Sequence, residues 1–192
     1  MLSNRLIQKY LEKQKLTIIK NDIRPWGGWY LIDDTNTFDK KIIHVEPKML
    51  LSLQYHGTPE NRGHKEIWEC CTRVRAIVSE KSVVGVAQDA LNELLGKLLV
   101  IDILPGGKLI IEPGVIHALV NPFDENLYVI ETRVSMKEET SIDREANITR
   151  IFDFTNRYGI PSYPQDLINR IMDPDFMPDY IINRGETFFT NL

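Results

Sequence analysis

The sequence predicts an all-β protein whose strands form an antiparallel sandwich or barrel. Short runs of apolar and β-branched residues recur at regular spacing without intervening helices, and Asn, Asp, Gly and Pro mark the turns between them. The predicted strands are residues 29–32, 41–45, 50–55, 67–78, 98–104, 108–111, 117–120 and 127–134.

Helical patterns are confined to three places. Leu6, Ile7, Tyr10 and Leu11 repeat at helical spacing and predict a helix within residues 1–20 that packs on the outside of the main domain. Residues 89–97 fit either a short helix or a loop, and a helical piece is expected near residues 165–172.

The length of 192 residues and the 43% hydrophobic content predict one domain with one core. We divide it into the N-terminal helix 1–20, a barrel over 24–159 and a tail over 160–192. The tail is expected to wrap over the barrel through five apolar anchors: Phe176, Tyr180, Ile181, Phe188 and Phe189.

Charge and composition exclude several functions. The net charge is −4 and the two signs are mixed along the chain, which argues against a nucleic-acid partner. No apolar run approaches the roughly 20 residues of a membrane span, and residues 1–16 do not resemble a secretory signal. Cys70 and Cys71 are adjacent, so they are poor disulfide partners, and a reduced, cytoplasmic protein is expected.

Four polar residues on or beside predicted strands could bind one metal ion. Alternation places Ser52, Gln54 and His56 on one face of a strand, Glu66 opens the next strand, and His117 follows a Pro-Gly turn. Imidazole, amide and carboxylate ligands suit zinc, nickel, cobalt, manganese or iron without selecting among them. The alternative is that these residues are satisfied core or surface groups.

The other two histidines are assigned differently. His64 lies in the loop 57–65, where a surface histidine is expected more than a ligand. His44 shares the face of Ile42 and is expected to be a polar-face residue.

An ordered series of motifs connects the chain to a known family. The motifs are Arg24-Pro25-Trp26-Gly27, Val45-x-Pro47, Leu51-Ser52-Leu53-Gln54-x-His56, Glu66-x-Trp68, Pro113-Gly114-x-x-His117-x-x-x-Asn121, Ile130-Glu131, Arg150-x-x-Asp153 and Tyr158-Gly159. Together they resemble the type II phosphomannose isomerase domain of the cupin superfamily over about residues 24–159. The resemblance implies a double-stranded β-helix, a jelly-roll barrel, with a metal on Gln54, His56, Glu66 and His117.

That domain often forms half of a bifunctional enzyme with mannose-1-phosphate guanylyltransferase. This sequence has no Gly-rich nucleotide loop, so guanylyl transfer is not implied. The chain also departs from the family pattern: Lys48 stands where the family usually has Gly, Pro113 comes one position late, and the loop 57–65 is longer. The four ligand residues are present despite these differences. The ligand residues do not determine the shape of the loops or the substrate specificity.

The resemblance implies interconversion of mannose 6-phosphate and fructose 6-phosphate with one divalent metal, zinc before the other ions. Glu131 is the candidate base, with a surface ion pair as its alternative. Arg133, Arg150 and Lys41 are candidates for binding the phosphate or stabilising the enediolate. Arg24 and Trp26 are assigned to packing at the barrel entrance.

Two other functions stay open: a cupin with different metal chemistry, such as an oxygenase or epimerase, and a non-catalytic sugar-binding cupin. The expected partner is a small sugar phosphate. A homodimer formed through an exposed sheet is a further expectation.

Overall fold

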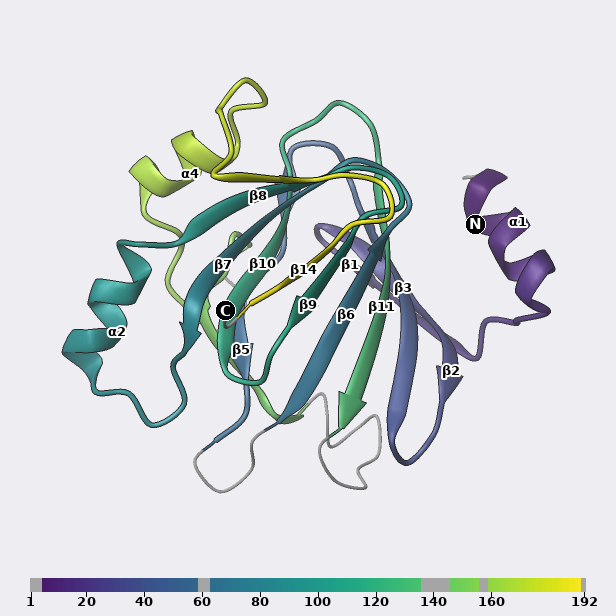
Figure 1. The fold of residues 1–192 in the computed structure, drawn as a ribbon, viewed down its shortest axis with the longest axis horizontal. Helices are drawn as coiled ribbons and strands as arrows, with labels where there is room; N and C mark the ends of the chain where they lie inside the picture. Colours follow the sequence, from purple (N-terminus) through teal and green to yellow (C-terminus); the bar gives the residue numbers. More distant parts are fainter. Residues whose placement is uncertain (1–4, 59–62, 136–145, 156–158, 191–192) are drawn as a thin grey trace.

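The computed structural model describes residues 5–58, 63–135, 146–155 and 159–190, and β-strands are its main secondary structure (Figure 1). The helices of this part are α1 (Arg5–Gln14), α2 (Gln88–Leu95) and α4 (Gln165–Ile171). The strands are β1 (Lys20–Arg24), β2 (Gly27–Asp34), β3 (Phe38–Val45), β4 (Met49–Leu50), β5 (Leu53–His56), β6 (His64–Cys70), β7 (Val74–Ser82), β8 (Leu99–Ile103), β9 (Lys108–Ile111), β10 (Val115–Asn121), β11 (Leu127–Ser135), β12 (Ile148–Phe152), β13 (Tyr180–Ile182) and β14 (Thr187–Phe189).

The strands form two sheets. Sheet A has the order β1-β2-β3-β11-β6-β9-β14, and sheet B has the order β12-β5-β10-β7-β8-β13, with β4 paired to β10. The chain passes back and forth between the segment β3-β11-β6-β9 of sheet A and the segment β5-β10-β7-β8 of sheet B, and only β7 and β8 follow each other within one sheet. This is the strand order of a jelly roll, so the predicted all-β double-stranded β-helix is confirmed.

Alternation along the strands separates the core from two outer layers. Inward-facing residues such as Trp68, Val74 and Leu119 form the core between the sheets. On the outside of sheet A, α1 packs through Ile7 against a small apolar cluster, as predicted for the N-terminal helix. Residues of α2, α4 and the tail cover the outer face of sheet B.

Some elements differ from the prediction. The predicted strand 67–78 is two strands, β6 and β7, because the chain turns at residues 71–73 without a Gly or Pro to mark the turn. The predicted helix ends at Gln14, and the strand β1 begins at Lys20. Residues 89–97 are mostly helical, in α2. Cys70 and Cys71 are both free, as expected.

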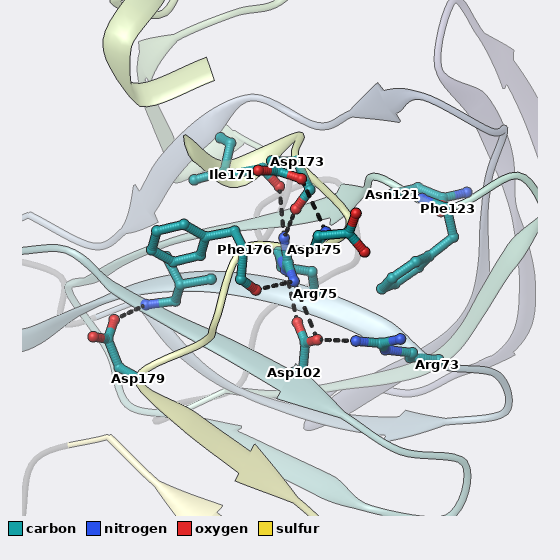
Figure 2. A network of polar contacts seen from close by, with 11 residues as sticks. Arg73, Arg75, Asp102, Asn121, Phe123, Ile171, Asp173, Asp175, Phe176 and Asp179 are labelled. Atoms are coloured by element: carbon teal, nitrogen blue, oxygen red, sulfur yellow. Dashed lines mark hydrogen bonds and ion pairs between the residues drawn. The ribbon is translucent and has the colours of Figure 1, made fainter. Parts of the chain in front are cut away.

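The tail is fixed to the barrel by a buried polar network around Arg75 on β7 (Figure 2). The Arg75 guanidinium donates to both carboxylate oxygens of Asp102, at 2.7 and 3.2 Å. It also donates to the backbone oxygens of Ile171, Asp173 and Phe176. Three backbone oxygens of the tail, which would otherwise need water as a hydrogen-bond donor, are therefore bonded by one buried side chain.

The tail then adds a strand to each sheet. β13 pairs in parallel with β8 and β14 pairs in parallel with β9. Three of the five predicted apolar anchors of the tail are wrong, because Tyr180, Ile181 and Phe189 are about half exposed. On β13 only Ile182 is buried, and on β14 Phe188 is partly buried between two exposed residues. Among the described residues no helix is long and apolar enough to cross a membrane.

Candidate metal centre and cavity

Strand register brings the predicted site residues together in two rows across the sheets. In sheet A, Glu131 on β11 lies between Lys41 on β3 and Trp68 on β6. Two residues further along β11, Arg133 lies between Asp39 on β3 and Glu66 on β6. The side chains of Lys41, Glu66, Glu131 and Arg133 therefore share the inner face of sheet A.

The row in sheet B supplies the remaining residues. Gln54 on β5 is the register partner of His117 on β10 and of Arg150 on β12. Ser52 and His56 line the same cavity as Gln54, which confirms the predicted common face of this segment. The two rows face each other across the barrel.

Three histidines surround the carboxylate of Glu66. His56 Nε2 lies 2.8 Å from Glu66 Oε1, His64 Nε2 lies 3.4 Å from the same oxygen, and His117 Nε2 lies 3.4 Å from Oε2. All four side chains are at least 97% buried. Ligands of a tetrahedral ion at about 2.0–2.1 Å are separated by roughly 3.3 Å, so these spacings suit one small divalent ion.

The hydrogen bonding of this cluster also fits a metal. Nε2 of each of the three histidines faces the Glu66 carboxylate and has no other partner within the described part of the chain. Buried polar atoms that lack partners are costly, and a divalent cation would take one lone pair from each ring. The other ring nitrogen of His117, Nδ1, donates to Val115 O at 2.9 Å, which leaves the Nε2 lone pair facing Glu66.

The pKa values of the three histidines and Glu66 favour the binding of a cation. Burial lowers the pKa of His56 to about 4 and also lowers the pKa values of His64 and His117, so the imidazoles are neutral at physiological pH. Burial alone would raise the pKa of Glu66, but His117 and His56 hold it well below its usual range. The cluster therefore offers neutral nitrogens and one carboxylate, the protonation state that metal binding requires.

The expectation for His64 was wrong, because this residue is buried and not a surface loop residue. Its ring lies 4.1 Å from the ring of His56, and His56, His64 and Glu66 form a group that could hold a metal ion. Gln54 Oε1, which was expected to face the metal, accepts a hydrogen bond from Ser52 Oγ at 2.8 Å. His44 stacks on Tyr128 away from the cluster.

Two glycines place the ligands. Gly63 has a φ of +76°, and a Cβ at this position would meet Gly57 N at 2.8 Å. Gly57 and Gly63 are therefore in close contact, and this contact places His64 beside His56. Gly114 has a φ of +79°, and its N–H donates to His56 O at 2.8 Å. This bond joins the turn before His117 to the strand end that carries His56.

A small cavity of about 70 Å³, partly open to solvent, lies over the cluster of His56, His64, Glu66 and His117. Seven of the eight predicted site residues line it: Lys41, Gln54, His56, Glu66, Glu131, Arg133 and Arg150. His117 lies behind Glu66 and completes the cluster. Arg24 and Trp26 also line the cavity, which agrees with their expected place at the entrance.

Glu131 is buried, so its alternative assignment to a surface ion pair is wrong. Burial, together with the charge of Glu66, raises the pKa of Glu131 to about 8, against the opposing effects of Arg133 and Lys41. Arg133 is also buried, and it is held by Asp39 through two hydrogen bonds of 2.9 and 2.7 Å. The Lys41 ammonium lies 4.8 Å above the Trp29 ring. These contacts fix charged groups around the cavity.

The cavity lining carries more positive than negative side chains. Arg24, Lys41, Arg133 and Arg150 face it, against the carboxyl groups of Glu66 and Glu131. Such a lining favours an anionic ligand with several oxygen atoms.

No protein-family model matches this sequence, and a comparison with curated proteins gives no match. Among solved structures the chain is similar to a capsular polysaccharide assembling protein, CapF, from Staphylococcus aureus (10% identity, TM-score 0.48, 70% of this chain and 34% of that one). It is also similar to an oxalate decarboxylase variant from B. subtilis (10% identity, TM-score 0.49, 88% and 40%) and to KdgF from Halomonas sp. (9% identity, TM-score 0.43, 60% and 84%). The chain thus spans between 34% and 40% of the length of the first two proteins.

Proposed function

We propose that this chain is a metal-dependent isomerase of sugar phosphates, and that it interconverts mannose 6-phosphate and fructose 6-phosphate. The observation that carries the proposal is one cavity in which two residues of the His56, His64, Glu66 and His117 cluster, His56 and Glu66, meet a buried carboxyl group and several cations. His56, His64, Glu66 and His117 would hold the ion. When bound, a divalent cation supplies a Lewis acid for the carbonyl oxygen of the sugar.

Glu131 would move the proton between the two sugar carbons. Its carboxylate takes the proton from C2 of the aldose and returns it to C1, while the hydroxyl proton on O2 ends on O1. The carbonyl group thereby moves from C1 to C2, and no external oxidant or reductant is needed. A carboxyl group with a pKa of about 8 suits this task, because it accepts a proton strongly and still ionises near neutral pH.

The arginines and Lys41 would hold the phosphate and orient the sugar. Arg150 on β12 and Arg24 on β1 lie on the cavity wall. Arginine binds phosphate through two parallel hydrogen bonds, which fixes direction as well as charge. Arg133 is tied to Asp39, so its role would be to keep its positive charge beside Glu131.

The test is a coupled assay that follows fructose 6-phosphate formation from mannose 6-phosphate. The protein is stripped of metal and then supplied in turn with zinc, cobalt, nickel, manganese and magnesium. We expect turnover to depend on the metal and to be lost in His117→Ala, whereas His44→Ala, a histidine outside the cluster, should stay active. Metal uptake without turnover on this substrate would contradict the proposed reaction and favour another cupin chemistry or a binding role.

A further inference from the structure

We propose that strand β1 pairs with β1 of a second copy of this chain, so that the protein forms a two-fold symmetric dimer. The starting point is the place of β1 in the fold. It stands at the end of sheet A and pairs with β2 on one side, and in the part of the chain that the structure describes no strand pairs with its other side. An edge strand offers its backbone N–H and C=O groups to a further strand.

Two isoleucines are exposed on and beside this edge strand. Ile23 is 69% exposed and Ile19, just before the strand, is 60% exposed. The register partner of Ile23 is Gly28, which has no side chain to cover it. Ile19 precedes the strand, and its N–H donates to Leu31 O at 2.8 Å, one position off the register of β1 and β2. Two exposed isoleucines therefore lie four residues apart along this edge of the sheet.

The charges of β1 select how two copies would pair. In a symmetric antiparallel pair centred on Asn21, Lys20 lies opposite the partner's Asp22, and Ile19 lies opposite the partner's Ile23. Symmetry repeats both contacts, and opposite charges and apolar pairs in facing positions stabilise a sheet. Centring the pair on Asp22 instead would place two aspartates together and Lys20 against the partner's Arg24. Charged residues on an edge strand usually prevent pairing with another strand. Here Lys20 and Asp22 lie on either side of Asn21, so two antiparallel copies of β1 place opposite charges together.

The strand also has a defined end. Pro25 follows β1 directly and has no N–H, so the pairing cannot extend beyond Arg24. Asp22 forms an ion pair with Arg24, and Arg24 lines the cavity. The partner's Lys20, opposite Asp22, would therefore lie at the edge of the cavity entrance, since facing residues of paired strands point to the same side.

The test is sedimentation analysis over a wide range of protein concentrations. We expect a monomer–dimer equilibrium whose Kd rises about tenfold or more in Lys20→Glu, because this change places two carboxylates opposite each other twice. Asp22→Lys should weaken the dimer in the same way. The double variant Lys20→Glu/Asp22→Lys restores complementary pairs and should return the Kd to within a few-fold of the starting value, which a merely structural effect would not do.

An apolar substitution gives an independent measurement. Ile23→Lys should abolish the dimer, whereas Ile181→Lys, the same change at a 57% exposed position on β13, should leave it intact. All these positions are at least partly exposed, so thermal unfolding should show that each variant is folded. A protein that stays monomeric at every concentration, or a dimer lost in Ile181→Lys but not in Ile23→Lys, would overturn the proposal. Neither outcome bears on the proposed isomerase activity.

Discussion

Glu131 is the residue whose ionisation should control the reaction rate. Its pKa is raised to about 8 by burial and by the negative charge of Glu66. The base form exists above the pKa, so kcat/KM for mannose 6-phosphate should increase with pH up to a plateau. A divalent cation beside Glu66 favours the carboxylate, so the midpoint in the metal-loaded enzyme should lie at or below about pH 8.

The measurement is a pH profile of kcat/KM for the native chain and for Glu131→Gln. The amide cannot accept the proton, so we expect a loss of about 10²- to 10⁴-fold and the disappearance of the profile. Glu69→Gln is the matched control, because this carboxylate pairs with Lys108 and does not line the cavity. An active Glu131→Gln enzyme with an unchanged profile would exclude Glu131 as the base.

Single residues show what sequence patterns can and cannot reveal. Strand alternation correctly placed Gln54 and His56 on one face, because that rule is local. His64 was missed because it was assigned to the preceding loop, although it begins β6 and alternation places it on the buried face of Glu66 and Trp68. Lys48, where the family usually has Gly, has a φ of +60° that glycine would adopt more easily, and its ammonium contacts Pro122 O and Asp124.

At the level of elements, most strands of the barrel were predictable, whereas β1, β12 and the two strands of the tail were not. Barrel strands such as β10 and β11 are long apolar runs bounded by turn residues. β13 and β14 have three residues each and exist because β8 and β9 offer free edges. No local pattern encodes such a pairing, nor the contact of Arg75 with a backbone almost a hundred residues away.

The Arg75 network should determine how firmly the tail is held. Arg75→Met leaves Asp102 buried with Arg73 as its remaining cationic partner, and three backbone oxygens lose their donor. We expect a loss of about 3 kcal/mol in the free energy of unfolding. Arg73→Met, at a side chain that is 48% exposed, should cost less than about 1 kcal/mol.

Urea denaturation of the two variants and of Arg75→Met/Asp102→Leu would measure these effects. The double variant removes the stranded carboxylate, so it should be more stable than Arg75→Met alone. Equal stability of Arg75→Met and the native chain would mean that the network does not hold the tail.

At the scale of the whole molecule, the metal cluster joins the two sheets. Glu66 and His64 come from β6 in sheet A, whereas His56 and His117 come from β5 and β10 in sheet B. An ion bound by all four would therefore link the two walls of the barrel, and the unfolded chain would not preserve its site. Binding to the folded state alone stabilises it by mass action, by about 2.7 kcal/mol at a metal concentration of one hundred times the Kd.

We therefore expect zinc to raise the Tm of the metal-stripped protein by roughly 5–10 °C, since 1 kcal/mol corresponds to about 2–4 °C in a chain of this size. His64→Gln should lose most of this increase, because His64 lies in the cluster. Gln54→Leu should keep it, because Gln54 Oε1 is bonded to Ser52. Thermal unfolding with zinc and with a chelator distinguishes the two ligand sets without reference to activity. The reverse result, with Gln54→Leu losing the increase and His64→Gln keeping it, would restore the set that the family resemblance implied, because the ion would then draw the Gln54 amide away from Ser52.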